Sequence, residues 1–488
     1  MKTNKIITIF IAVLTMVAIQ SCEKFLDVEP EQSVSDATVF SSHEGVVNAL
    51  NGAWERIAGP QLYAGTSIFH SDLVANQNDM NWIGTFIGYR EMNWKTLSTT
   101  DGTISAKWIR AYHAIDMANN VLANLDLVRA ADRDRVEGEA LFIRGIMYFE
   151  LVRFYALPFV KGDANTHDGV PLVTTPTTGI TDASYPSRAS VAAVYQQILS
   201  DLNGAKGKLT GVGTGAGANA GRATSSVAAA FLARVHLAME EWQLAAQEAD
   251  FVIGNFGGYG ALHANPRAAF NNDEYTSEDV FMINQNANSH AGAANDGIAT
   301  FFASLPGMGR GDLNVTQAHL DRYEPGDLRA TMLNNPDVVI IADVPTMFYV
   351  GVGTDAGNIM SSKWGKYDAN INVIRLAEMI LTRAEANFRN GSSIGASPLD
   401  DVNAIRNRAG VEPWTELTLQ RIYEERKREL AFEGHMLHDL RRFRGSTVAP
   451  AGSTHAGQTL QWNDPRLVFP IPQREMDTNP NLTQNSAY

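Results

Sequence analysis

The feature that most constrains the fold of this 488-residue chain is the recurrence of apolar residues at helical spacing over long segments. Apolar residues three and four positions apart form one face of an amphipathic helix, and that face must be buried against another element. The segments with this spacing are residues 43–58, 108–125, 136–154 and 191–202. They predict a mainly α fold in which helices pack on helices.

Two further segments, residues 224–253 and 374–409, predict helical hairpins, because each holds two apolar stripes separated by a short break. Three of the predicted helices share a pattern of two apolar residues, any residue and then Arg, at 141–144, 231–234 and 380–383. Since their spacing is irregular, we interpret them as divergent hairpin repeats separated by insertions. The predicted architecture is an α-α superhelix similar to tetratricopeptide repeats.

Residues 1–21 have the pattern of a targeting segment. Two lysines precede a 14-residue apolar stretch, Ile6–Ile19, which is shorter than the ~20 residues a membrane-spanning helix needs. Ser21 then precedes Cys22, the only cysteine of the chain, as in a bacterial lipobox. We expect residues 1–21 to be a lipoprotein signal peptide and Cys22 to carry the lipid anchor. The alternative is an ordinary signal peptide followed by an unpaired cysteine.

The charge of the chain excludes some partners. Its formal net charge is −14, and it has no run of Lys and Arg longer than three residues. Nucleic-acid binding needs clustered basic residues, so no nucleic-acid partner is predicted. An acidic body does not adhere to anionic lipid by charge, so attachment to a membrane would rest on the lipid anchor alone.

No strong catalytic or cofactor motif is present, so we predict no enzyme activity, no catalytic residue, no cofactor and no metal. One alternative is a metal site at His435, His438 and Asp439, on a charged helix predicted over 419–443. Another is a pair of hydrolytic carboxylates such as Asp400 and Asp401. For the histidine group we favour ordinary positions on the face of a charged helix. Asp400 and Asp401 are predicted to open a helix, where the helix dipole stabilises carboxylates.

The segment 59–104 is the best candidate for a binding site. It lacks a helical period but interleaves aromatic residues with Asn and Asp. Aromatic faces suit the apolar faces of sugar rings, and amides and carboxylates suit their hydroxyls. The predicted ligand-binding residues are Asp79, Asn81, Trp82, Tyr89, Asn93 and Trp94, with Trp82 as the stacking platform. A second region of similar composition lies at 284–312, and the alternative is that these aromatics pack a loop onto the helices.

A glycine-rich stretch at 203–222 is the best candidate for an internal boundary. We therefore divide the mature chain into an N-terminal segment, 22–222, and a C-terminal segment, 223–488, and expect them to form one integrated globular body. Within the second segment, residues 254–373 are predicted to be rich in loops.

Several stretches together resemble a known family. Its post-lipobox start matches Cys22–Val28 with Pro30, and its first long repeat helix matches Glu139–Arg144. The densest similarity covers 403–411, 422–434, 439–442 and 469–485, including Phe469-Pro470-Ile471-Pro472. On these motifs, which span nearly the whole mature chain, the sequence resembles the SusD/RagB family of nutrient-uptake outer-membrane lipoproteins of the Bacteroidetes.

This resemblance implies an all-α body of about four tetratricopeptide-type units with an irregular ligand-binding face. It also implies a lipoprotein exposed at the outer-membrane surface that captures an oligosaccharide or polysaccharide. The ligand would be delivered to a partner TonB-dependent transporter of the SusC type. The alternatives are a peptide-uptake lid of the same architecture and, less favoured, a surface glycan hydrolase.

Overall fold

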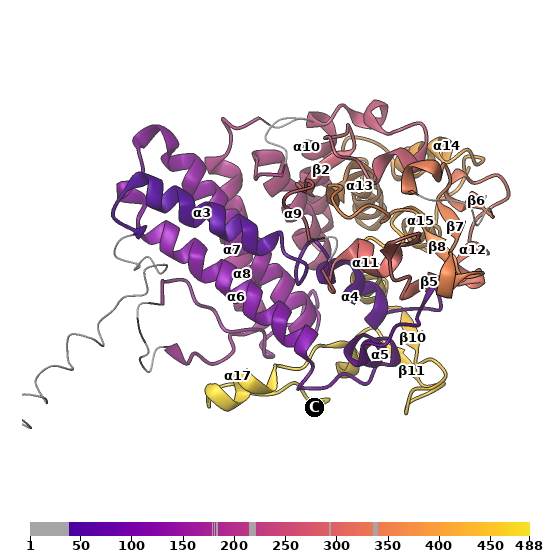
Figure 1. Ribbon diagram of the computed structural model, residues 1–488. Helices are drawn as coiled ribbons and strands as arrows, with labels where there is room; N and C mark the ends of the chain where they lie inside the picture. Colours follow the sequence, from indigo (N-terminus) through magenta and orange to yellow (C-terminus); the bar gives the residue numbers. More distant parts are fainter. Residues whose placement is uncertain are drawn as a thin grey trace, which may run out of the picture.

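The computed structural model describes residues 39–177, 179, 181, 184–213, 221–291, 294–334 and 340–488 (Figure 1). The predicted signal peptide and the predicted lipid anchor, Cys22, lie outside the described residues. Within them, the structure has 15 α-helices and a smaller number of residues in short strands. The prediction of a mainly α fold is therefore confirmed.

The long helices follow one another through space in chain order. Each packs chiefly on its neighbours in the series, and the first four lie together on the left of Figure 1. The series is α3 (His43–Ile57), α6 (Gly102–Ala123), α7 (Ala130–Tyr155), α8 (Val191–Lys208), α9 (Ser225–Ala238), α10 (Trp242–Asn255), α13 (Leu376–Asn390) and α14 (Pro398–Arg408). The two predicted hairpins are α9 with α10 and α13 with α14. Assignment of the series to tetratricopeptide units remains a prediction.

Side-chain hydrogen bonds cap the N-termini of four of these helices. Ser42, Ser190, Thr224 and Ser397 each accept a hydrogen bond from a backbone N–H in the first turn of α3, α8, α9 and α14, respectively. Such caps satisfy donors that have no partner inside the helix. They explain why these helices begin where the apolar stripes begin.

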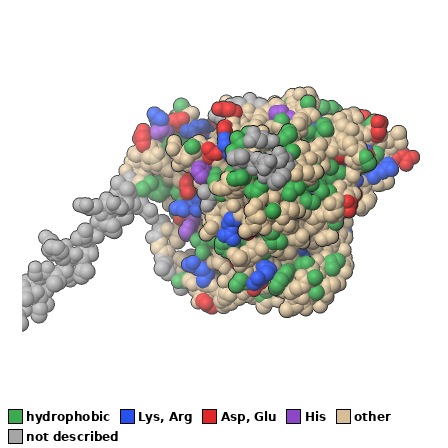
Figure 2. Space-filling view, turned by 45° about the vertical axis from the view of Figure 1, so that its right-hand side comes forward, with side chains coloured by type: hydrophobic (Ala, Val, Ile, Leu, Met, Phe, Trp, Pro, Cys, Tyr) green, Lys and Arg blue, Asp and Glu red, His purple; other side chains and the backbone are tan. Residues whose placement is uncertain are grey.

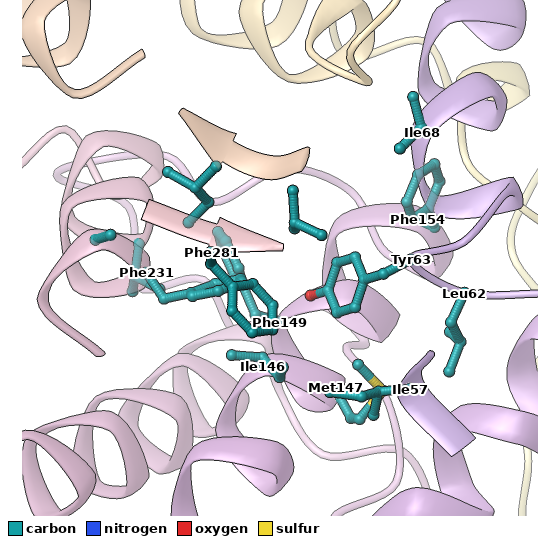
Figure 3. Close-up of a cluster of buried hydrophobic side chains, with 14 of the residues drawn as sticks. Ile57, Leu62, Tyr63, Ile68, Ile146, Met147, Phe149, Phe154, Phe231 and Phe281 are labelled. Carbon is teal, nitrogen blue, oxygen red and sulfur yellow. The ribbon is translucent and has the colours of Figure 1, made fainter. Parts of the chain in front are cut away.

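Aromatic rings join the helices to the rest of the body. Phe142 of α7 lies 5.3 Å from Phe231 of α9 and 5.7 Å from Phe281, measured between ring centroids, and both contacts are edge to face. Figure 3 shows Phe231, Phe281 and Phe149 gathered beside Tyr63. The hydrophobic cluster to which they belong runs from Val46 to Leu482, so the same core includes residues of both predicted segments.

Residues 254–373 contain short strands and irregular connections, as the sequence predicted. Five strands form one sheet in the order β1 (Met80–Trp82), β5 (Leu313–Val315), β8 (Ile359–Ser361), β7 (Phe348–Val350) and β6 (Met332–Leu333). The two-stranded sheets are β2 (Asp279–Ile283) with β9 (Ile371–Arg375), β3 (Ser304–Leu305) with β4 (Met308–Gly309), and β10 (Ser446–Val448) with β11 (Thr459–Gln461). Short helices complete the body: α11 (Ile298–Phe302), α12 (Gln317–Leu320) and α17 (Gln473–Thr478).

The segment 59–104 contains two helices that its pattern did not predict, α4 (Thr66–Val74) and α5 (Ile87–Trp94). All nine residues of α4 are buried, including Ser67, His70 and Asp72. A helix buried on every side has no polar face, so its sequence shows no amphipathic period.

The predicted charged helix over 419–443 is also corrected, because it is two helices, α15 (Leu419–Glu429) and α16 (Met436–Arg442). The chain turns between them with positive φ at Phe432 (63°) and Gly434 (82°). A Cβ at position 434 would lie 2.9 Å from the Cα of Ile68 in α4, so the close approach of α4 requires glycine. The break therefore lets the chain contact α4.

A buried network of ion pairs holds this break in place. Arg375, at the end of β9, pairs with Glu278 at 3.0 Å, Glu429 at 3.2 Å and Glu433 at 2.7 Å. Lys363 lies 2.6 Å from Glu433. Burial alone would raise the pKa of Glu433, but Arg375 and Lys363 lower it to about 2. The carboxylate is thus ionised inside the protein.

Figure 2 shows acidic and basic side chains interspersed on the face that it draws. None of the helices that the structure describes is both long enough and apolar enough to cross a lipid bilayer.

We predict that Glu433→Gln lowers the free energy of unfolding at neutral pH by about 3 kcal/mol, because it leaves Lys363 and Arg375 buried with one acid fewer. Chemical denaturation measures the change. The matched control is Glu274→Gln at an exposed position, expected to change stability by less than about 0.5 kcal/mol.

The loss should also depend on pH. Since the pKa of Glu433 is about 2 in the folded protein and the ordinary value for Glu is about 4.3, its stabilisation is complete above about pH 4.3 and is lost as the pH falls toward 2. The difference between wild type and Glu433→Gln should shrink over that range. A difference that stays constant would contradict this assignment.

Candidate functional site

A cavity of about 860 Å³ lies between the segment 76–95 and the hairpin β10–β11. The residues that line it are Asn76, Gln77, Asn78, Asn81, Asn93, Lys95, Ser446, Thr447, Val448, Ala449, Pro450, Ala451, Ala456 and Gly457. Small-molecule sites commonly have volumes of about 300–1,000 Å³. The cavity is thus large enough for a ligand of several rings.

Hydrogen bonds between distant parts of the chain fix the two walls. The Gln77 Nε2 amide donates to the Ser446 carbonyl at 2.6 Å, and the Thr447 hydroxyl donates to the Asn76 carbonyl. The Ser453 hydroxyl donates to the Trp94 carbonyl at 2.8 Å. The walls are therefore joined before any ligand arrives.

The amide groups of the cavity divide into used and unused ones. Asn76 Nδ2 donates to the Met80 carbonyl at 2.6 Å and to Asn93 Oδ1 at 2.9 Å, while its Oδ1 accepts from the Asp79 backbone N–H. Within the described residues, the side chains of Asn78 and Asn81 and the Nδ2 of Asn93 make no hydrogen bond to the protein. These groups offer donors and acceptors to a ligand.

Among the described residues that line the cavity, Lys95 is the only ionisable one. Its side chain is buried, and its Nζ donates to the Leu73 carbonyl of α4 at 2.9 Å. Burial lowers the pKa of Lys95 to about 7. The charge of this wall therefore changes close to neutral pH, where Lys95 titrates.

Two of the six predicted ligand-binding residues, Asn81 and Asn93, line this cavity. They come from different elements: Asn81 is the middle residue of β1 and exposed, and Asn93 lies near the end of α5 and is 6% exposed. The bond from Asn76 holds Asn93 toward the same space.

Trp82 and Tyr89, by contrast, lie in the core. The Trp82 ring is 7% exposed and packs 5.0 Å from Tyr89 and 5.2 Å from Phe301, between centroids. Tyr89 is fully buried, and its hydroxyl donates to Asp296 at 2.5 Å. In this arrangement Trp82 presents no open face for a sugar, so the expectation of a stacking platform does not match its position. The rings pack the 284–312 region against α5.

Asp79 is buried and ion-paired. One carboxylate oxygen accepts from His319 Nδ1 at 2.9 Å and from Arg322 Nε at 2.7 Å. Burial alone would raise the pKa of Asp79, but His319 and Arg322 lower it below its usual value. These bonds hold the turn from Asn76 to β1.

Trp94 is half-buried and is not among the residues that line the cavity. The Arg90 guanidinium lies 5.2 Å from its ring centroid, and a Cβ added at Gly452 would lie 3.2 Å from the ring. The ring therefore packs beneath the 450–457 loop.

The residues of the second wall, from Ser446 to Gly457, were missed by the sequence reasoning. They are more than 350 positions from the first wall, and their composition has no aromatic–amide pattern. Nothing in the sequence marked this wall; the structure marks it by Val448, an apolar residue that is 51% exposed in β10 and lines the cavity.

We predict that Trp82→Ala destabilises the protein by about 3–5 kcal/mol, because the ring fills a packed aromatic cluster. Thermal and chemical denaturation measure the loss, and Trp82→Phe is the matched control that keeps most of the packing. A Trp82→Ala variant as stable as wild type would show that the ring is not part of the core.

We also predict a pH-dependent effect of Lys95→Met. The pKa of Lys95 is about 7 when folded, against an ordinary value of about 10.4, so the cost of burying its charge is full below about pH 7 and disappears toward pH 10. Wild type should therefore gain stability relative to Lys95→Met as the pH rises over that range. Equal changes in the melting temperatures of both proteins would contradict the burial of a titrating ammonium.

Comparison with known proteins agrees with this architecture. Residues 24–237 match a family model described as "Starch-binding associating with outer membrane", and residues 334–488 match the model of the SusD family. The chain is 27% identical to SusD-like protein P2 of Formosa agariphila, over 100% of this chain and 99% of that protein. It is 32% identical, over 25% of this chain and 22% of that protein, to the starch-binding protein SusD of Bacteroides thetaiotaomicron.

Solved structures show the same fold. A SusD superfamily protein from Bacteroides thetaiotaomicron superposes with a TM-score of 0.77 at 25% identity, covering 91% of this chain and 99% of that one. A SusD-like carbohydrate binding protein from Bacteroides vulgatus superposes with a TM-score of 0.73 at 22% identity, covering 92% and 99%. With the two family models matching both ends of the described body, the chain belongs to the SusD/RagB family.

Proposed function

We propose that the protein captures an oligosaccharide in the cavity between segment 76–95 and β10–β11. The observation that carries this proposal is the set of unused amide groups on Asn78, Asn81 and Asn93 around a space of about 860 Å³. The amides of Asn78 and Asn81 can each donate to one hydroxyl and accept from another, and the Nδ2 of Asn93 can donate to a third, which suits the rim of a sugar. The family description, starch binding in association with the outer membrane, supports the same ligand class.

The chemistry of the walls favours binding without catalysis. Glycoside hydrolysis commonly needs two carboxyl groups about 5–10 Å apart. No Asp or Glu is among the residues that line this cavity. The protein would hold the sugar and release it unchanged.

The proposal includes the place of the protein in uptake. The Cys22 lipid would tether it to the outer membrane, at the cell surface, and a SusC-type TonB-dependent transporter would receive the glycan. The sequence supports the tether, since Cys22 follows a lipobox-like segment. Pull-down of a SusC-type transporter from outer membranes by the acylated protein, and not by Cys22→Ser, would test both parts.

A peptide is the second candidate ligand, and β10 is the observation that favours it. This strand pairs only with β11 among the described residues, and Ser446, Thr447 and Val448 line the cavity. An extended peptide can bind along a strand edge through backbone hydrogen bonds.

Calorimetry with the protein that starts at Glu23, against glycan and peptide libraries, tests the function. Binding to one class of glycan supports the proposal. Binding to peptides alone overturns it in favour of the second candidate. Release of reducing sugar during the incubation would show a hydrolase instead.

We predict that Asn81→Ala weakens oligosaccharide binding about tenfold, the loss of roughly one net hydrogen bond, with an unchanged melting temperature because the side chain is exposed. The matched control is Asn203→Ala, an exposed amide on α8 outside the cavity. Equal affinities of Asn81→Ala and Asn203→Ala for the glycan would place its binding elsewhere.

A further inference from the structure

A second cavity, of about 60 Å³, lies where the end of α7 meets α9 and α16. Among the described residues, it shares no lining residue with the cavity between segment 76–95 and β10–β11, called the amide cavity below. Its wall contains six arginines, namely Arg153, Arg234, Arg426, Arg441, Arg442 and Arg444. Three carboxylates, those of Glu240, Glu378 and Asp439, also line it. So much positive charge around a small space is unusual in a chain of net charge −14.

Five of these arginines are neutralised by acids. The pairs are Arg153 with Glu150, Arg234 with Glu378, Arg426 with Asp439, Arg442 with Glu385 and Arg444 with Glu240. Lys107, 3.7 Å from Glu150, adds a further positive charge behind the wall. Glu150 is therefore shared by two cations.

Arg441 is the exception. Its side chain is 7% exposed, and its guanidinium donates only to backbone carbonyls, those of Arg153 and, at 3.0 Å, Leu467. No acid lies within ion-pair distance of it in the part of the chain that the structure describes. A buried charge without a counter-ion is costly, so an anion bound in the cavity would be stabilised by Arg441.

Residues that line the cavity also hold unpaired nitrogen atoms. The Nε atoms of Arg441 and Arg153 and the Nε2 of His438 are buried, and none has a hydrogen-bond partner among the described residues. Buried N–H groups are nearly always bonded, and an ion or water bound there would satisfy them. Burial lowers the pKa of His438 well below its ordinary value, so its imidazole is neutral and one ring nitrogen carries hydrogen.

We propose that this cavity binds one small oxyanion, sulfate or phosphate, with the guanidinium of Arg441 as its counter-ion and Arg153 and His438 as further contacts. One water needs about 10–15 Å³ of cavity volume, so a cavity of about 60 Å³ holds about four to six water-sized groups. A tetrahedral oxyanion, with five non-hydrogen atoms, falls in this range. A sugar ring does not fit. The mouth is accessible, because the Arg444 side chain is 36% exposed.

This site is independent of the proposed sugar capture, and its first test uses inorganic salts alone. The melting temperature of the full body is measured in sodium sulfate, in sodium phosphate and in sodium chloride at equal ionic strength and pH. Sulfate or phosphate should raise it by about 2 °C in a saturable way, since a ligand that binds only the folded state stabilises it. Equal melting temperatures in all three salts would overturn the proposal.

Variants locate the effect. Arg441→Gln should abolish the sulfate-dependent rise, while Arg474→Gln, which removes an arginine whose side chain is 69% exposed, should keep it. His438→Phe, which removes the unpaired Nε2 without a change of charge, should weaken sulfate binding several-fold. A sulfate-dependent rise that persists unchanged in a folded Arg441→Gln would place the anion elsewhere.

Diffraction from wild-type crystals soaked in selenate gives an answer that does not depend on the folding of a variant. An anomalous selenium peak in the cavity beside Arg441 is the expected result. Ordered waters there, with no anomalous peak, would overturn the proposal. A 6-sulfated monosaccharide serves as a further probe. If it raises the melting temperature at concentrations where free sulfate has no effect, the anion that binds is part of a larger ligand and not a free ion.

Discussion

The buried network of ion pairs around Arg375 and Glu429 is the constraint on which the rest of the structure depends. Arg329, Arg375 and Arg408 all reach Glu429, at distances of 3.3, 3.2 and 2.5 Å. They come from a 3-10 helix (Leu328–Ala330), from the end of β9 and from the end of α14, respectively. The network therefore fixes where the helical series meets the irregular face. Its pairs are costly to desolvate, so each carboxylate is stable only with its cations in place.

A short series of contacts connects this network to the amide cavity. Glu433, a member of the network, is followed by the turn at Gly434. The backbone N–H groups of Gly434 and Met436 both donate to Asp72 of α4 at 3.1 Å. The carbonyl of the adjacent Leu73 accepts from Lys95, which lines the cavity. The position of the amides thus depends on the register of helices far from them.

The sequence predicted the helices that bury one face and expose the other to solvent. Helices such as α3 and α8 keep a polar face and show a period, whereas α4 is buried all round and shows none. The break between α15 and α16 was not predicted either, because the contact that requires Gly434 is with Ile68, about 366 positions earlier. The second wall of the cavity was not predicted for the same reason, because nothing in the sequence around Ser446 and Thr447 indicates a contact with Asn76.

Within the candidate site, the composition of segment 59–104 identified the place but not the direction of each side chain. In a strand, neighbouring side chains point to opposite faces. Met80 and Trp82 of β1 are buried and Asn81 between them is exposed. A ligand that meets Asn81 therefore cannot also stack on Trp82 from the same strand. The aromatic residues and the amides have separate roles, since the rings hold β1 and α5 on the body and so set the positions of the amides around the cavity.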